Sequence, residues 1–342
     1  MMDIIGFIIK IIRYLIYDLT HMGPVFKAVI FPGLTFVFIL AIILVWLERK
    51  MAAKVQMRIG PLYAGGPEGI LQPIADFIKF AFKELIIPDQ ADKLLFIALP
   101  IASLIVAIAP VAFLPYSPQM VIAPNKLGFL LAMAFVTLFP LIILLTGWAS
   151  NSKYAFIGGI RAAYQQIGYE IPMWFSALGV ALAAKSFDLV EIVEAQQPLW
   201  FAVTQPIGAL VFFIAMVAEM GRIPFDLPEA EQEIAAGWFV EYSGIMFGLY
   251  MVSAMLLKLY VLSLLFTVIY LGGWLPGWGS PEVWTFVKAF IVMFLIMFFR
   301  AVFPRTRIKT FINMAWTKLL PLSVINLFIV FMLTFAGFYG GV

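Results

Sequence analysis

The chain has 342 residues, of which 64% are hydrophobic and only 12% are charged. A soluble domain carries about 25% charged residues, so this composition excludes a soluble protein and indicates a polytopic membrane protein. The net charge of +3 is too small to indicate nucleic acid as a partner. The absence of cysteine and a single histidine, His21, exclude a cysteine-bound iron–sulfur cluster and a histidine-based metal site. Any redox centre is therefore expected in a partner, and no metal ligand is expected here.

The hydropathy pattern predicts an all-α fold in one integral membrane domain over residues 1–342. A spanning helix needs about 20 apolar residues. About eight segments meet this requirement, namely 29–47, 94–114, 127–148, 163–184, 202–219, 242–270, 284–303 and 320–339. Before them, residues 4–17 are apolar but contain Lys10 and Arg13, which is typical of an interfacial helix or of a short additional membrane segment.

The basic residues predict the orientation in the membrane. They concentrate in the loops after the first, third, fifth and seventh segments, whereas the opposite loops hold only Lys126 and Lys185. The positive-inside rule places the basic loops in the cytoplasm. We therefore expect a multi-pass protein of a prokaryotic cell membrane with both termini on the outer side.

The first cytoplasmic-side loop, residues 48–93, contains an amphipathic helix. In residues 71–86, Ile74, Ile78, Phe82 and Leu85 fall on one stripe, while Asp76, Lys79 and Lys83 fall elsewhere. Such a helix is expected to lie on the membrane surface or just beneath it.

Ionisable side chains within membrane spans are costly and are functional candidates. The pattern places Glu170, Glu219, Glu241 and Lys258 in or at the ends of spans, with Arg161 just ahead of the fourth. Burial favours the neutral form of a carboxyl group, so these acids could exchange protons near neutral pH. The alternative is static pairing, of Lys258 with a glutamate and of Arg161 with Glu170.

The acidic loop, residues 219–241, follows the fifth span. Asp226-Leu-Pro-Glu229 is typical of a capping box at a helix start. A cap does not explain Glu231, Glu233 and Glu241, and the loop contains one cation, Arg222. The surplus of acids predicts a bound ion, a proton or a basic partner surface.

Four blocks of sequence resemble the H subunit family of respiratory complex I, which includes mitochondrial NADH dehydrogenase subunit 1. They are ERKMAAKVQMRIGP with LQPIADFIKFAFKE (48–61 and 71–84), GWASNSKYAFIGGIRAAYQQIGYEIP (147–172), EMGRIPFDLPEAEQEIAAGWFVEYS (219–243) and FPRTRIKTFINMAWTKLLPLSVINL (303–327). They occur in the family's order over nearly the whole chain, and the family's eight-helix architecture matches the predicted spans.

The resemblance implies a membrane subunit of a multisubunit oxidoreductase that anchors a hydrophilic redox arm with iron–sulfur clusters. Its other partners would be antiporter-like and small membrane subunits within the lipid bilayer. It implies a quinone at the interface with that arm, and a funnel of carboxylates leading from it. Carried over by position, the carboxylates are Glu170, Glu219, Asp226, Glu229, Glu231, Glu233 and Glu241, with Arg161, Arg222 and Lys258 as supporting charges. Candidates for the quinone chamber or the arm interface are Arg49, Gln56, Arg58, Asp76, Lys79, Phe225 and Lys309.

The sequence also departs from the respiratory pattern. Ile308, Lys309 and Thr310 stand where quinone-type members have an aromatic residue followed by Asp-Gln, and Met220-Gly221 replaces a pair that ends in Asn. The residues at these positions are more similar to those of the membrane-bound hydrogenase branch, in which no quinone is needed. The expected function is that of one component of a redox-driven H⁺ or Na⁺ pump with the electron acceptor open.

Two alternatives come from other classes of protein. One is a stand-alone proton-coupled secondary transporter, which predicts internal repeats that the sequence does not show. The other is a purely structural anchor for a soluble enzyme, which has no use for acids within the membrane.

Overall fold

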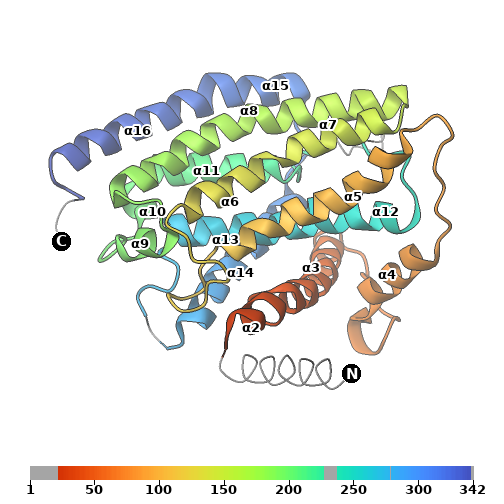
Figure 1. The fold of residues 1–342 in the computed structure, drawn as a ribbon, viewed down its shortest axis with the longest axis horizontal. Helices are drawn as coiled ribbons and strands as arrows, with labels where there is room; N and C mark the ends of the chain where they lie inside the picture. The colour runs from red at the N-terminus through yellow and green to blue at the C-terminus, as the bar shows by residue number, and fades with distance from the viewer. Residues whose placement is uncertain (1–21, 227–236, 278, 340–342) are drawn as a thin grey trace, which may run out of the picture.

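Long helices that run roughly parallel dominate this computed structural model, which describes residues 22–226, 237–277 and 279–339 (Figure 1). The described part of the chain contains helices and no strands. The segment 4–17 and the acids Glu229, Glu231 and Glu233 lie outside the described residues. The expectation of an all-α polytopic fold is confirmed.

Seven helical segments of the described chain are long and apolar enough to cross a membrane. Their bounds are Pro24–Val55, Lys93–Ala112, Gly128–Ala149, Lys153–Ala184, Gly244–Tyr270, Pro281–Val302 and Lys309–Phe335. Each contains or overlaps one of the eight predicted spans. The remaining predicted span, 202–219, is where the prediction differs from the structure.

Proline interrupts that span. α10 (Phe201–Thr204) ends at Gln205, and α11 (Pro206–Glu219) begins again with Pro206 in its first turn. Proline has no backbone N–H to continue the preceding helix, but it fits the first turn of a new one. The 14 residues of α11 rise only about 21 Å, less than the hydrocarbon core of roughly 30 Å. α11 therefore ends inside the bundle, and the acidic loop begins there.

The remaining helices have the following bounds. They are α2 (Pro24–Val29), α3 (Leu34–Val55), α4 (Gln72–Phe82), α5 (Lys93–Ile108), α6 (Gly128–Thr137), α7 (Phe139–Ala149), α8 (Lys153–Ala184), α9 (Leu189–Glu194), α12 (Gly244–Tyr250), α13 (Lys258–Tyr270), α14 (Pro281–Val302), α15 (Ile308–Met314) and α16 (Leu320–Phe335). α12 and α13 are joined by a π-helical stretch, Met251–Leu257, and α15 and α16 by another, Ala315–Leu319.

Several helices extend beyond the predicted spans. α3 continues to Val55, so the first loop begins later than residue 48. α8 begins at Lys153 rather than near residue 163, and Arg161 is therefore inside this helix. The last membrane-spanning segment begins as α15 at Ile308 rather than near residue 320, so Lys309 lies in the first turn of α15. Apolar windows underestimate the length of these helices, because the helix turns outside the apolar window are polar.

The helix formed by α12, the π-helical stretch and α13 is the centre of the bundle. In its most apolar 18-residue window, 89% of the residues are buried, against 22–61% for the other spans. Its polar side chains must therefore find partners inside the protein. Two of these contacts join hydroxyl groups, Ser253 to Ser103 at 2.9 Å and Tyr260 to Tyr116 at 2.8 Å.

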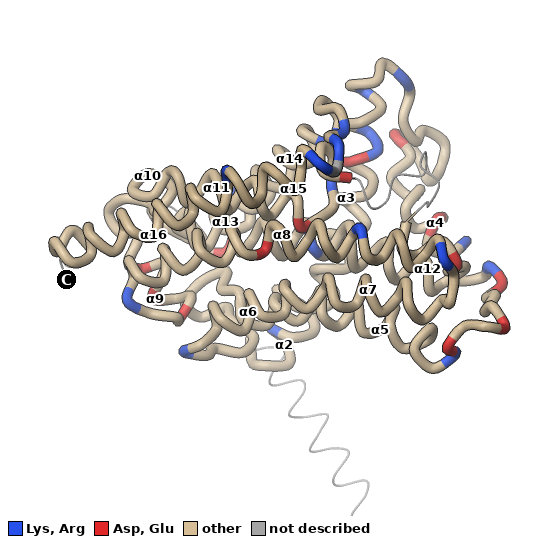
Figure 2. Tube along the Cα trace, turned by 90° about the horizontal axis from the view of Figure 1, so that it is seen from above, with Lys and Arg blue, Asp and Glu red and all other residues tan. Residues whose placement is uncertain are grey.

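The predicted amphipathic helix of the first loop is present as α4, although it ends at Phe82 rather than near residue 86. Phe80 packs against Phe247 of α12, with ring centroids 5.5 Å apart. The opposite apolar stripe is open, with Ile74, Ile78 and Phe82 exposed by 38%, 51% and 85%. Figure 2 shows charged residues gathered at the end of the molecule that holds α4 and α12.

Candidate functional site

A buried ion pair joins the end of α11 to the start of α13. The Lys258 ammonium donates to Glu219 Oε1 at 2.6 Å and to the Glu219 carbonyl at 2.9 Å. It also lies 3.9 Å from the centroid of the Phe139 ring. The Glu219 side chain is fully buried and that of Lys258 is 5% exposed. Because α11 stops short, this pair lies near the middle of the central helix and not at its end.

Glu170 of α8 completes a group of three charges, which we call the central cluster: Glu170, Glu219 and Lys258. The Glu170 carboxylate interacts electrostatically with both other members. One oxygen of each carboxylate, Glu170 Oε1 and Glu219 Oε2, is buried and accepts no hydrogen bond from any described residue. With two carboxylates and one ammonium, the cluster is neutral only when one carboxyl group holds a proton. An unpaired buried charge is costly, so the charge balance of this cluster depends on its protons.

Two glutamines of α8 hold the end of α11 against the central cluster. Gln165 Nε2 donates to the Phe225 carbonyl at 2.7 Å, and Gln166 Nε2 donates to the Glu219 carbonyl at 3.1 Å. Both side chains are buried. The last carbonyl groups of a helix have no partner within the helix, and Gln166 supplies one to Glu219 at the end of α11. Gln165 binds the following loop at Phe225. The position of Glu219 is therefore set from α8 as well as from α13.

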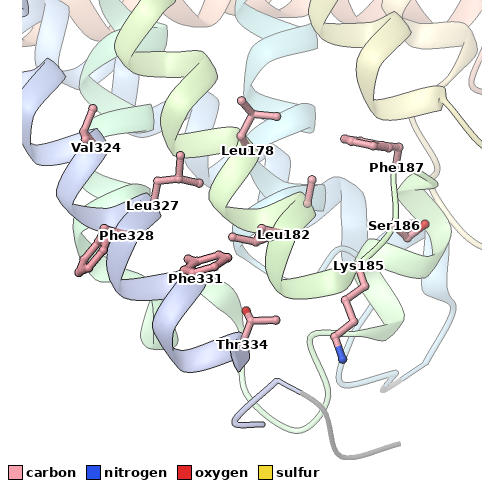
Figure 3. A pocket seen from close by; sticks show the side chains of 11 residues that line it. Leu178, Leu182, Lys185, Ser186, Phe187, Val324, Leu327, Phe328, Phe331 and Thr334 are labelled. Carbon is pink, nitrogen blue, oxygen red and sulfur yellow. The ribbon is translucent and has the colours of Figure 1, made fainter. Parts of the chain in front are cut away.

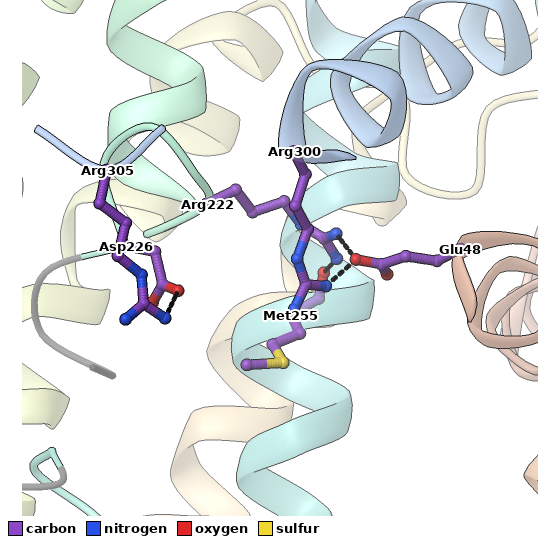
Figure 4. A network of polar contacts seen from close by, with 6 residues as sticks. All are labelled: Glu48, Arg222, Asp226, Met255, Arg300 and Arg305. Atoms are coloured by element: carbon purple, nitrogen blue, oxygen red, sulfur yellow. Dashed lines mark hydrogen bonds and ion pairs between the residues drawn. The ribbon is translucent and has the colours of Figure 1, made fainter. Parts of the chain in front are cut away.

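A second cluster, which we call the arginine cluster, lies along the same loop and consists of Glu48, Arg222 and Arg300. Arg222 and Arg300 both donate to Glu48 Oε1. Arg222 Nη2 also donates to the Met255 carbonyl at 2.6 Å, within the π-helical stretch (Figure 4). π-Helical turns are frequent at functional sites, and here one supplies an acceptor for a buried guanidinium group.

Asp226 takes part in a third contact, with the segment that follows α14. Arg305 Nη2 donates to Asp226 Oδ2 at 2.9 Å (Figure 4). The Thr306 amide and hydroxyl both donate to the Pro224 carbonyl, at 3.0 Å each. The predicted capping partner, Glu229, lies outside the described residues, so the capping box stays a prediction. What the structure adds is a cationic partner for Asp226.

Phe225 lies in an aromatic group rather than on an open wall. Its ring centroid is 4.7 Å from that of Phe311 and 5.7 Å from that of Tyr169. The Tyr169 hydroxyl donates to the Phe311 carbonyl at 2.8 Å. This group packs α8, the acidic loop and α15 together.

The predicted chamber candidates of the first loop lie at the surface, and some are paired. Arg49 forms an ion pair with Asp76 of α4, and Arg58 Nε donates to Gln56 Oε1 at 2.8 Å. Lys79 is exposed on α4. Beside them Lys50 bonds Glu68, and this contact lowers the pKa of the Glu68 carboxyl.

Three predicted residues lie apart from the central cluster. Glu241 is half-buried in a turn before α12, and no hydrogen bond or ion pair joins it to another described residue. Lys309 is exposed at the start of α15. Arg161 and Glu170 are nine residues apart on one helix, which places them on opposite faces and about 13 Å apart along the axis. The direct pair considered between them is therefore wrong, because Glu170 faces Glu219 and Lys258.

The sequence prediction missed three charged residues, of which Glu48 and Lys288 are buried and Arg300 is partly exposed. Glu48 directly follows an apolar run and falls in the predicted loop, whereas Lys288 and Arg300 lie within the predicted seventh span. Lys288 Nζ donates to the carbonyls of Leu271 at 2.6 Å and Gly273 at 2.9 Å. The signal was present, because each interrupts or ends an apolar segment, but the partners are distant in sequence.

Comparison with known proteins gives a consistent family. A family model described as NADH dehydrogenase matches residues 27–331. The H subunit of the NADH-quinone oxidoreductase of Geobacillus kaustophilus is 44% identical over 284 residues, which cover 82% of this chain and 85% of the relative. That of Geobacillus sp. (strain WCH70) is 42% identical over 310 residues, 88% of this chain and 93% of the relative. That of Bacillus cereus (strain B4264) is 42% identical over 286 residues, with 82% and 86% covered. The matched region includes every ion pair described above.

Proposed function

Because the chain belongs to the H subunit family of NADH dehydrogenases, a membrane component of an oxidoreductase complex, we propose that it couples electron transfer in that complex to ion translocation. The coupling element is the loop that begins at Glu219, together with the carboxylates of the central cluster. The ion is H⁺ in this proposal, because the cluster is neutral when it holds one proton.

One observation carries the proposal. Three charged residues of a single short segment, Glu219, Arg222 and Asp226, each bind a different part of the molecule. Glu219 binds the central helix, Arg222 binds α3, and Asp226 binds the segment after α14. A displacement of this segment would therefore change several buried charge pairs together.

The protonation of the central cluster and the position of this segment are linked by electrostatics. Protonation of Glu219 would weaken its attraction to Lys258, and loss of the proton would restore it. Such a group has two charge states, each of which favours a different arrangement of its neighbours. A redox event that moves the segment 219–226 would thereby change the proton affinity of Glu170 and Glu219.

We place the redox partner at the end of the molecule that holds α4 and the charged loops. The charge distribution supports this, since charged residues gather at that end (Figure 2). The exposed cations Arg49, Lys79 and Arg305 could contact a hydrophilic partner surface. Iron–sulfur subunits of the redox arm would bind there, and antiporter-like and small membrane subunits would contact the long helices. Basic loops also favour this end as the cytoplasmic side, with the termini outside.

We propose a quinone as the electron acceptor, and the names of the relatives support this choice over a hydrogenase-type reaction. Quinone would approach between α4 and α3, where α4 keeps an exposed apolar stripe and Phe77 contacts Phe38 at 5.9 Å between ring centroids. The polar groups within or just after α3 and α4 would line that approach, namely Arg49, Gln56, Arg58 and Asp76. Lys309, which reverses the charge expected there, would then act at the arm interface. A stand-alone transporter gains no support, because the relatives are subunits of a complex.

The experiment is proton pumping by the purified complex in proteoliposomes, with electron transfer measured in parallel. Glu170→Gln is expected to retain electron transfer and lose most of the proton uptake, because the central cluster can no longer gain or release a proton at that position. Glu194→Gln, an exposed acid of α9, is the matched control and should behave as the wild type. Full pumping by Glu170→Gln would contradict the proposal.

A further inference from the structure

A groove lies between the C-terminal halves of α8 and α16, far along the chain from the clusters described above. Its volume is about 780 Å³. Leu178, Leu182 and Phe187 line one side of the groove, and Leu327 and Phe331 extend toward that side from α16 (Figure 3). The two hydroxyl groups that line the groove both form hydrogen bonds within the chain. The Thr334 hydroxyl donates to the Val330 carbonyl, and the Ser186 hydroxyl accepts from the Asp188 amide. The lining therefore offers an apolar surface to its occupant.

The groove flanks a tight contact between the two helices. At Gly179 of α8, an added Cβ would lie 3.0 Å from Asn326 Nδ2 of α16. α16 belongs to the span that is least buried of the seven, with 22% of its apolar window inside the described structure. Phe328 and Phe331 are exposed by 64% and 52%. The groove is thus open to the surroundings along the side of the molecule.

Its length matches one leaflet of a bilayer rather than a whole membrane. The lining runs on α16 from Val324 to Thr334, which corresponds to about 15 Å at the rise of an α-helix. One leaflet of the hydrocarbon core is also about 15 Å deep, half of roughly 30 Å. A partner helix that crosses the membrane would need a groove about twice as long.

The volume of the groove, about 780 Å³, can be compared with the volume of a lipid acyl chain. A methylene group takes up roughly the ~30 Å³ of a water molecule in the liquid, so the groove holds roughly 25 of them. This is the size of one or two acyl chains.

Lys185 marks one end of the groove and is the only charged residue among those that line it in the described chain. It lies just past the end of α8 in a left-handed conformation, with φ 55°. Glycine is the usual residue at this helix position, because a side chain is strained there. A lysine in this place puts an exposed ammonium group at one end of an apolar groove.

We propose that this groove is a binding site for an anionic phospholipid, with an acyl chain between α8 and α16 and the phosphate on the Lys185 ammonium. The apolar lining accounts for the chain, the length of the lining matches one leaflet, and the single cation favours a negative headgroup. The site is independent of electron transfer and of the central cluster.

The test measures lipids retained by the purified complex after exchange into detergent supplemented with phosphatidylcholine and phosphatidylglycerol. Lys185→Gln is expected to lower the ratio of retained phosphatidylglycerol to phosphatidylcholine about fivefold at this site, the effect of one cation near a lipid surface. Lys126→Gln, an exposed lysine outside the groove, is the matched control and should leave the ratio unchanged. Leu327→Trp, which narrows the groove, should reduce both lipids.

A photoreactive residue in place of Phe328 keeps the proposal falsifiable if a groove variant fails to assemble. The expected product is a lipid adduct of this chain. A crosslink to another protein of the complex instead, or lipid ratios that are equal in Lys185→Gln and the wild type, would overturn the proposal.

Discussion

The pair between Lys258 and Glu219 gives the sharpest stability prediction. At 2.6 Å and an effective dielectric constant of about 20, the Coulomb attraction between the two charges is roughly 6 kcal/mol before desolvation is subtracted. Removal of one member of a buried pair costs about 3–5 kcal/mol, because the other charge stays buried without its partner. Lys258→Met should lie at the upper end of this range, since it leaves two carboxylates together.

The double variant Glu219→Gln/Lys258→Met distinguishes this reasoning from a simple packing defect. It removes one charge of each sign, so we expect it to be more stable than Lys258→Met alone. A coupling free energy of about 1–3 kcal/mol should appear in the double-mutant cycle, as for residues in direct contact.

The assay is heating of the purified complex, followed by size-exclusion chromatography that detects this chain. For a large domain, 1 kcal/mol shifts the midpoint by about 2–4 °C, so Lys258→Met should lower it by roughly 10 °C. Lys126→Met, which replaces an exposed lysine, should shift it little. Equal midpoints for Lys258→Met and wild type, or strictly additive effects in the cycle, would show that Lys258 and Glu219 do not stabilise the protein as a buried ion pair.

Three further predictions use matched variants. Gly158→Ala should weaken assembly by about 1–3 kcal/mol, because the new Cβ would lie 2.7 Å from the Gly237 carbonyl carbon, whereas Gly168→Ala should be tolerated, since its nearest neighbour is 3.7 Å away. Thermal midpoints that do not separate these two variants would argue against the close packing of α8. Glu48→Gln should lower the midpoint far more than Glu68→Gln, because the buried Glu48 binds both Arg222 and Arg300, whereas Glu68 forms a solvent-exposed pair, which contributes little to stability. Similar midpoints would contradict this. The third variant neutralises three acids of the acidic loop, Glu229→Gln/Glu231→Gln/Glu233→Gln. It should abolish proton pumping in proteoliposomes while the complex still assembles, and retained pumping would show that these three acids are dispensable.

Much of the fold follows from the order of apolar segments in the sequence. Seven of the eight predicted spans correspond to long helices, because 20-residue apolar runs have few alternatives in a membrane. The break at Pro206 was not predictable from proline alone, because α5 and α8 continue through Pro100 and Pro172. What a hydropathy window cannot show is depth: α11 ends in mid-bundle, and this places Glu219 beside Lys258 rather than at the membrane surface.

The charge partners were only partly predictable, for a physical reason. A charged side chain inside a membrane is energetically costly, and this identified Glu170, Glu219 and Lys258 as residues that need partners. The structure brings these three together. The contact between Glu48 and Arg300 was missed, because the two residues are 252 positions apart in the sequence. Sequence periodicity describes neighbours along one helix, and such pairs depend on which helices meet.

The proposed coupling requires that the Glu170–Glu219–Lys258 cluster changes its protonation when the complex is reduced. Infrared difference spectroscopy of the purified complex, reduced minus oxidised, measures this most directly through the C=O stretching band of protonated carboxyl groups. We predict such a band in the wild type and in Glu194→Gln, and its loss or shift in Glu170→Gln. Difference spectra that are identical in all three proteins would contradict the account.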